Sequence, residues 1–334
     1  LLMKKLIVLL LAFAMVGAVS AQVTTAIALS GNVIIVDQAG KATFAPNGNG
    51  YDTWTFKASD KDGTYGFSIT DQNILSLTTL LGPDGSDTDT AADEVKIGGF
   101  DIRDWNVWYK TAYFKAIMGN LRNGDFRLAA PYGYSSYMSS SDRISGYGLL
   151  LETLPMNGLT FGVNLPIGTT AANTVDILKK ADLGAKYAIK DVGTLFAMAN
   201  LDLVASANVL NAGFNYTGVK GLNAILNFRG KFNADQYNVY LGLDYTAIEK
   251  LEAYFEAYFQ YNAGVVGWQV FAEGDYDLAK NLTGIVGAAV GDASYLDVYG
   301  ELDYAFGNGL IAKGVVGYDT ALYAQLKAYY SVSF

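Results

Sequence analysis

Apolar and polar residues alternate along much of the chain. In the final run, 322–334, Leu322, Ala324, Leu326 and every second residue after them share one face, and mostly polar side chains share the other. A period of two residues is typical of a strand with one apolar and one polar face. Four other runs alternate in the same way: 222–232, 236–245, 251–261 and 294–306. The pattern therefore predicts a chain built from β-strands.

The connections between these runs form two classes that alternate along the chain. One class is short and turn-like, as in DKDG (60–63), PMNG (155–158) and FGNG (306–309). The other class includes the long segments 37–50, 73–93, 123–143 and 169–180. Short turns at one end and longer loops at the other are typical of transmembrane β-barrels. The count predicts an all-β, antiparallel, up-and-down barrel of about 18 strands. Sixteen is the alternative, because the first three strands are weakly patterned.

One predicted strand, 97–109, departs from strict alternation. Its pattern breaks near Arg103 and Asp104. An extra residue in one strand of a pair shifts the side chains that follow it to the other face. We therefore expect a β-bulge at this position.

The start of the sequence carries the pattern of an export signal. Lys4 and Lys5 precede the apolar run LIVLLLAFAMVGAV, and small residues follow up to Ala21. This order predicts a secretory signal peptide, 1–21, cleaved after Ala21. A membrane-spanning anchor is the alternative, but no stop-transfer charges follow the apolar run. The barrel is expected to comprise 22–334.

Composition narrows the class of protein. Hydrophobic residues make up 51% of the chain, which is high for a secreted soluble protein, and alternation along strands accounts for it. The net charge of −9 argues against nucleic acid as a partner. There are no cysteines and no histidines, so no thiolate metal site, cofactor or histidine-based catalysis is expected. A hydrolase that uses carboxylates alone stays open. The acidic loop 82–94 does not fit the EF-hand pattern, and a solvated loop is the favoured interpretation.

Aromatic residues recur near the lower ends of the strands that descend to the short-turn side. They are spaced by 28 to 31 residues, which is one hairpin each: Tyr187, Tyr216, Tyr245, Tyr276, Tyr304 and Phe334. An amphipathic ring is most stable at the boundary between lipid and water. The series predicts an aromatic girdle, of which Phe334 is the last member.

The charges on the polar faces are unevenly distributed. The acidic positions expected to line the interior are Asp244, Glu252, Glu256, Glu273, Asp275, Asp297, Glu301 and Asp303. The basic ones are Lys115, Lys186, Lys190, Arg229, Lys231 and Lys327. On this register no lysine or arginine faces inward between Lys231 and Lys327. We expect an acidic sector flanked by basic positions, and the alternative is a wet interior of mixed charge.

Taken together, the signal peptide, the alternation, the two classes of connection and the terminal Phe334 resemble the Gram-negative porin family over the whole of 22–334. The resemblance implies a barrel in outer-membrane lipid that acts as a passive channel for small hydrophilic solutes or ions. It implies that the barrel-assembly machinery reads the last strand through Phe334, with Tyr330 and Val332 on the same face. It also implies that the third external loop, 123–143, narrows the lumen, and the alternative is an exposed loop that contacts a host or a neighbour. Its candidate residues are Arg127, Tyr132, Tyr134 and Tyr137.

The acidic sector leads us to expect a mild preference for cations. A monomer and a homo-trimer are both open. The main alternative is a non-conducting surface barrel that acts as an adhesin or envelope-structural protein through its external loops. A transporter of hydrophobic substrates is a third candidate. It would need an N-terminal plug, and only about 15 residues precede the strand-like sequence at 33–36.

Overall fold

The computed structural model describes residues 22–36, 42–47, 53–72, 101–128, 143–167 and 179–333. Apart from two short 3-10 turns, the regular structure in this part is β-strand. The strands are, in chain order, β1 (Gln22–Val36), β2 (Ala42–Asn47), β3 (Thr53–Ser59), β4 (Tyr65–Gln72), β5 (Asp101–Lys110), β6 (Phe114–Arg127), β7 (Arg143–Thr153), β8 (Leu159–Pro166), β9 (Asp182–Ile189), β10 (Gly193–Asn200), β11 (Val209–Val219), β12 (Leu222–Lys231), β13 (Gln236–Tyr245), β14 (Leu251–Asn262), β15 (Val265–Ala279), β16 (Leu282–Gly291), β17 (Leu296–Gly307), β18 (Leu310–Asp319) and β19 (Ala321–Ser333). Among the described residues, no helix is long and apolar enough to cross a membrane.

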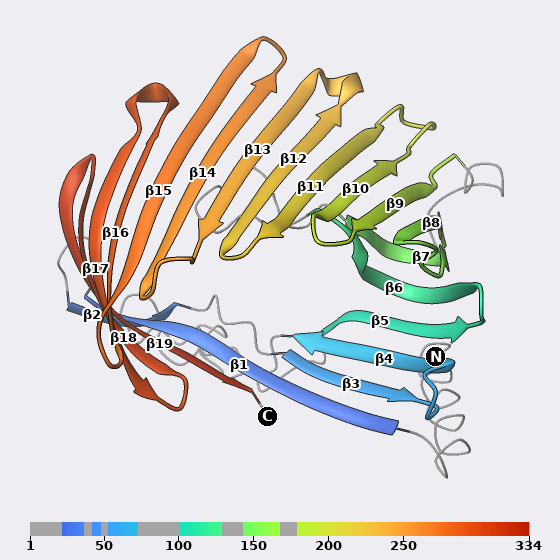
Figure 1. The fold of residues 1–334 in the computed structure, drawn as a ribbon, viewed down its shortest axis with the longest axis horizontal. Coiled ribbons are helices and arrows are strands. Elements are labelled where there is room, and N and C mark those ends of the chain that lie inside the picture. The colour runs from blue at the N-terminus through green and yellow to red at the C-terminus, as the bar shows by residue number, and fades with distance from the viewer. Residues whose placement is uncertain are drawn as a thin grey trace, which may run out of the picture.

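The strands follow one another around a ring. Each strand from β3 to β18 pairs antiparallel with the next one in the chain. β1 pairs with β19 on one edge, and with β3 and then β2 on the other. Because β2 and β3 share one edge of β1, the nineteen strands of the described chain occupy eighteen positions. Figure 1 shows them standing around a common interior. The predicted antiparallel, up-and-down barrel of about 18 strands is confirmed.

The two faces of the strands differ as the alternation predicts. Along β17, Leu296, Val298, Leu302 and Tyr304 are exposed, while Asp297, Tyr299, Glu301 and Asp303 between them are partly buried. Exposed leucines, valines and aromatic residues recur in the same way on most other strands. An exposed apolar surface of this extent is unusual for a water-soluble monomer. The outer face of the ring is therefore suited to lipid.

Two of the short turns show why their sequences favour tight hairpins. Asn157 and Gly158 join the chain after β7 to β8, and Asn308 and Gly309 join β17 to β18; all four have positive φ. Asn-Gly with positive φ at both residues is typical of the two-residue hairpin turn whose twist matches the flanking strands. A Cβ at Gly309 would lie 1.9 Å from the Ser331 carbonyl oxygen, so only glycine fits there.

The predicted bulge in β5 is also confirmed. Thr70 pairs with Asp104, but the next residue, Asp71, pairs with Ile102, so Arg103 is the extra residue. Of the N-terminal residues, Gln22–Val36 form strand β1 of the wall, so this described segment is not the plug that a transporter of hydrophobic substrates would need. The predicted signal peptide 1–21 and the acidic loop 82–94 lie outside the described residues.

Candidate functional site

The interior of the ring contains an apolar cluster built by strands that are not neighbours. It joins side chains of β6, β7, β10, β12, β13 and β14. Strands on different parts of a ring can share one cluster only across its inner face. The buried members are Ile117, Leu121, Phe126, Leu128, Ile144, Leu150, Met198, Ile225, Tyr240 and Tyr258.

The third external connection begins inside this cluster. Arg122 pairs with Ser145, but the next pair is Arg127 with Arg143, so the chain leaves the ladder between Arg122 and Arg127. Phe126 and Leu128, on either side of Arg127, are 1% and 2% exposed. The segment therefore bends onto the inner wall where the strand pairing is interrupted.

Glycines on the facing strands make room for it. A Cβ at Gly162 of β8 would lie 2.3 Å from the Phe126 ring, and one at Gly184 of β9 would lie 2.4 Å from it. These two glycines are direct cross-strand partners, so together they form one patch of the wall without side chains. A Cβ at Gly213 of β11 would lie 2.9 Å from Leu128 Cδ2. We call Phe126 and Leu128 on these glycines the inward wedge.

The inward wedge lies within the segment predicted to form the constriction loop, 123–143. Arg127 lies between the two wedge residues, is partly buried and has an interaction partner within the protein. The other three candidates, Tyr132, Tyr134 and Tyr137, lie outside the described residues. The sequence did not single out Phe126 or Leu128. Their signal was the apolar character of two residues in a segment that otherwise looks like a polar loop.

The acidic sector lies on neighbouring strands, and tyrosine hydroxyls hold several of its carboxylates. Glu256 is 2% exposed and accepts a hydrogen bond from the Tyr240 hydroxyl at 3.1 Å. Glu273 accepts a hydrogen bond from the Tyr299 hydroxyl. The Tyr323 hydroxyl lies 3.5 Å from Asp297 Oδ1. The inner wall therefore fixes these carboxylates rather than leaving them on free side chains.

One part of the predicted charge pattern is wrong. Lys313 of β18 is partly buried on the inner face, although the sequence predicted no inward lysine between Lys231 and Lys327. Its Nζ lies 2.8 Å from Glu301 Oε1 and 2.6 Å from Asp303 Oδ2. Asp303 is its direct cross-strand partner, so an ion pair offsets the cost of placing the lysine there. The small and apolar residues around Lys313 gave no clear alternation from which to read its face.

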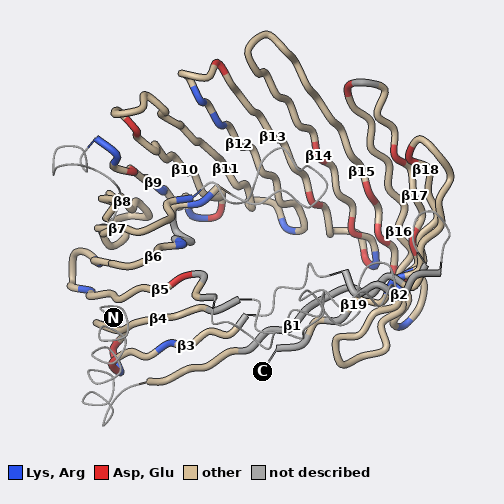
Figure 2. Tube along the Cα trace, turned by 180° about the vertical axis from the view of Figure 1, so that it is seen from behind, with Lys and Arg blue, Asp and Glu red and all other residues tan. Residues whose placement is uncertain are grey.

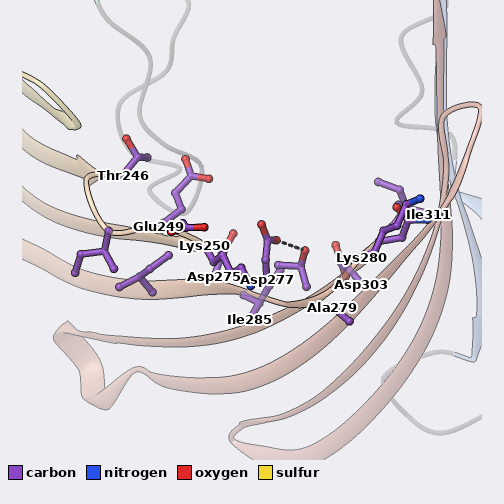
Figure 3. A pocket seen from close by; sticks show the side chains of 16 residues that line it. Thr246, Glu249, Lys250, Asp275, Asp277, Ala279, Lys280, Ile285, Asp303 and Ile311 are labelled. Atoms are coloured by element: carbon purple, nitrogen blue, oxygen red, sulfur yellow. Dashed lines mark hydrogen bonds between the residues drawn. The ribbon is translucent and has the colours of Figure 1, made fainter.

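A pocket lies at the turn-side end of the acidic sector. Its volume is about 660 Å³, and it is shown in Figure 3. Glu252, Asp275 and Asp303 line it from the wall, and Asp277 accepts a hydrogen bond from Thr283 at 3.1 Å. Lysines from two turns, Lys250 and Lys280, line the same pocket. Among the described residues, no group of three or more carboxylates is arranged to hold a metal ion.

The other predicted charged positions are distributed over several strands. Asp244 lies on β13, Lys115 on β6, Lys186 on β9, Arg229 and Lys231 on β12, and Lys327 on β19. Lys190 is in the exposed turn after β9, at the rim of the wall rather than on it. Figure 2 shows acidic residues gathered on β14, β15 and β17, with others on β5 and in the turn between β3 and β4, and it shows basic residues on β12, on β3 and near the turn joining β5 to β6. Those last residues, Lys57 and Lys110, were not among the predicted positions.

Amide side chains link four strands of the inner wall. Asn164 Nδ2 on β8 donates to Asp182 Oδ2 on β9 at 2.9 Å, and Asn200 Nδ2 on β10 donates to Asp182 Oδ1 at 3.0 Å. Asn211 Nδ2 on β11 donates to Asn200 Oδ1 at 3.3 Å. Hydrogen-bonded networks of this kind fix side chains in a partly buried, polar wall.

The predicted girdle tyrosines lie near the turn ends of their strands. Tyr187, Tyr245, Tyr276 and Tyr304 are exposed, and Tyr216 is partly exposed. The first half of the chain adds aromatic residues that the predicted series did not include: Tyr65, Tyr109, Tyr113 and Phe114, all exposed. Phe334 lies outside the described residues. The backbones of Tyr330 and Val332 pair with Gly31 and Leu29 of β1.

Comparisons with known proteins show similarity at the level of structure. No known family pattern and no curated protein sequence matches this chain. A mutant of the Rh. blastica porin matches with 13% identity and a TM-score of 0.52, covering 94% of this chain and 100% of the other. A BenF-like porin from Pseudomonas fluorescens Pf-5 matches with 13% identity and a TM-score of 0.53, covering 94% and 98%.

A third solved structure gives the same result. Pseudomonas aeruginosa OpdQ matches with 12% identity and a TM-score of 0.53, covering 94% of this chain and 97% of the other. Sequence identity at this level does not identify common site residues, so the comparison concerns architecture. The three matches cover 94% of this chain and 97% or more of the other. The chain therefore has the porin β-barrel fold.

Proposed function

We propose that this protein is a porin of the bacterial outer membrane, a passive diffusion channel for small hydrophilic solutes that catalyses no reaction. The observation that carries the proposal is the inverted wall of a ring with eighteen strand positions: on most described strands apolar side chains are exposed on the outer face, while charged and amide side chains gather on the inner face. Barrels of about 16 to 18 strands leave an aqueous channel, whereas barrels of about eight are filled by side chains. The predicted signal peptide, 1–21, would direct export to that membrane.

The first test is the physical state of the product. Protein expressed as 22–334 should refold in detergent, give a β-sheet circular dichroism spectrum and migrate differently on gels before and after heating. In a planar bilayer it should open ion-conducting steps. A water-soluble or helical product would exclude the barrel in lipid. A folded barrel without conductance would favour the alternative, a non-conducting adhesin or envelope-structural barrel.

We further propose a mild cation preference. The acidic sector has eight predicted carboxylate positions, and Lys313 contacts two of them, but its single positive charge offsets only one negative charge. Charges that line a narrow aqueous path bias which ions enter it. Water and salt screen them, with a Debye length of about 10 Å at 0.1 M, so the preference should weaken as the salt concentration rises.

The last strand provides a test in cells. Phe334→Ser should reduce the amount of assembled barrel in the outer membrane more than Leu322→Ser does, because the proposed assembly signal lies at the end of β19. Leu322 is a suitable control, since it is 85% exposed on the same strand. Membrane yield, measured by heat-modifiable migration of the membrane fraction, decides the matter. Equal yields for the two variants would remove the assembly role of Phe334.

A further inference from the structure

A second pocket, on the opposite side of the ring from the acidic sector, is lined by lysines. It has a volume of about 450 Å³ and lies near the turn side, between Gly63 and Leu154. Lys57 of β3, Lys110 at the end of β5 and Lys115 of β6 line it. No carboxylate is among the described residues that line it. We call these three residues and their surroundings the lysine pocket.

The arrangement of the lysines is unfavourable without a counter-charge. Lys110 and Lys115 are direct cross-strand partners, and like charges placed directly opposite destabilise a sheet. On the other side of the ring Lys313 has two carboxylates at ion-pair distance. The partner of Lys115 on β7 is Glu152, which is 5% exposed and does not line the pocket. Lys115 therefore has Lys110 opposite it on one side and Glu152 on the other, so the three lysines of the lining outnumber this one neighbouring carboxylate.

The pocket is also held in a fixed shape. The Trp108 ring occupies the space above Gly66, where a Cβ would lie 2.3 Å from it, and its Nε1 lies 3.4 Å from the Gly63 carbonyl oxygen. Lys57 Nζ lies 5.4 Å from the centroid of this ring, within the range of a cation–π contact. The contact orients the Lys57 ammonium group before any ligand arrives. Preorganised donors bind more strongly, because less conformational freedom is lost on binding.

Neutral hydrogen-bond donors complete the lining. Ser59, Ser68 and Asn106, whose side chains carry hydroxyl and amide donors, line the same pocket. Ammonium, hydroxyl and amide donors together match an oxyanion, whose oxygens each accept more than one hydrogen bond. Hydrogen bonds to a charged acceptor are about twice as strong as neutral ones.

We propose that the lysine pocket binds the oxyanion group, carboxylate or phosphate, of a small solute that passes through the lumen. The inference rests on the proposed channel only for the route by which the solute reaches the pocket. It adds a binding position for anions on the wall opposite the acidic sector (Figure 2). Free cations and anionic solutes are then drawn to different sides of the same path.

Calorimetric titration of the detergent-solubilised protein at low ionic strength tests the proposal. Inorganic phosphate and malonate, each titrated separately, should show saturable binding to the wild type. The variant with Lys110→Gln and Lys115→Gln should bind about tenfold more weakly, a loss of about 1.4 kcal/mol. The matched control is Lys231→Gln, a lysine on β12 outside the pocket, which should bind like the wild type.

Several outcomes would overturn the proposal. They are the absence of saturable binding of both anions, equal binding by the double lysine variant, and an equal loss in the Lys231→Gln control. Binding of only one anion would support the pocket and assign its chemistry to phosphate or to carboxylate. Heat-modifiable migration must show that each variant is folded. Since binding in detergent needs no conduction, a barrel that binds without conducting would refute the channel and retain the site.

Discussion

Replacing Phe126 and Leu128 by serine should raise the single-channel conductance severalfold while the barrel stays assembled. Both side chains are buried on glycines of the facing strands, and this contact holds the start of the third external connection against the inner wall. Removing it frees the segment from the lumen. Truncating buried aromatic or aliphatic side chains costs about 3–5 kcal/mol in soluble cores, so the temperature of heat-modified migration should fall. Only the Arg127–Arg143 pair of the β6–β7 ladder adjoins the wedge, so the rest of the strand pairing should persist.

The matched control is Phe232→Ser. Phe232 is an aromatic residue at the same loop side of the barrel, 51% exposed in the short turn between β12 and β13. It should leave conductance at the wild-type value. Bilayer recordings of both proteins at one salt concentration make the comparison. A wedge variant that is folded but conducts like the wild type would show that Phe126 and Leu128 do not narrow the path.

Charge selectivity should move in opposite directions for two sets of variants. The change of Glu256, Glu273 and Glu301 to glutamine removes three negative charges, so preference for K⁺ over Cl⁻ should fall. Lys313→Gln removes the positive charge that lies between Glu301 and Asp303, so the preference should rise. Glutamine keeps the size of glutamate and can still accept the Tyr240 hydrogen bond, which limits structural change.

The measurement is the reversal potential across a KCl gradient at low ionic strength. The difference between wild type and each variant should shrink as salt rises, because screening shortens the reach of the charges. Anion preference in the wild type would contradict the role of the acidic sector. A shift of the same sign in both sets would mean that the variants act through a change of structure rather than through charge.

The regular parts of the wall could be predicted from sequence because they follow a local rule. Alternation determines which side chain faces lipid, as along β17, and a single broken alternation near Arg103 was enough to predict the bulge in β5. The short turns were equally readable, since Asn308 and Gly309 favour a hairpin by themselves. These features need no knowledge of distant strands.

The features that were missed depend on contacts between different strands. The facing of Lys313 is explained by Asp303 and Glu301 on the neighbouring strand, not by its own apolar surroundings. Phe126 is held by Gly162 and Gly184, which are far from it in sequence. Lys57 and Lys110 line one pocket because the pairing of β3 with β4 and of β4 with β5 brings their strands together. The alternation of apolar and polar residues along one strand does not show which residues of other strands lie beside it.

The pairing of β1 with β19 has a consequence for the order of events during folding. Ala28–Val36 meet Leu326–Ser333, so this pairing joins the two ends of the described chain, whereas most hairpins join strands only a few residues apart. Local hairpins form within about 1–10 μs, but pairings between distant segments form slowly. Until the two ends meet, the growing sheet keeps two unpaired edges that can recruit other chains. The time before the ends meet is therefore when the protein is most exposed to aggregation.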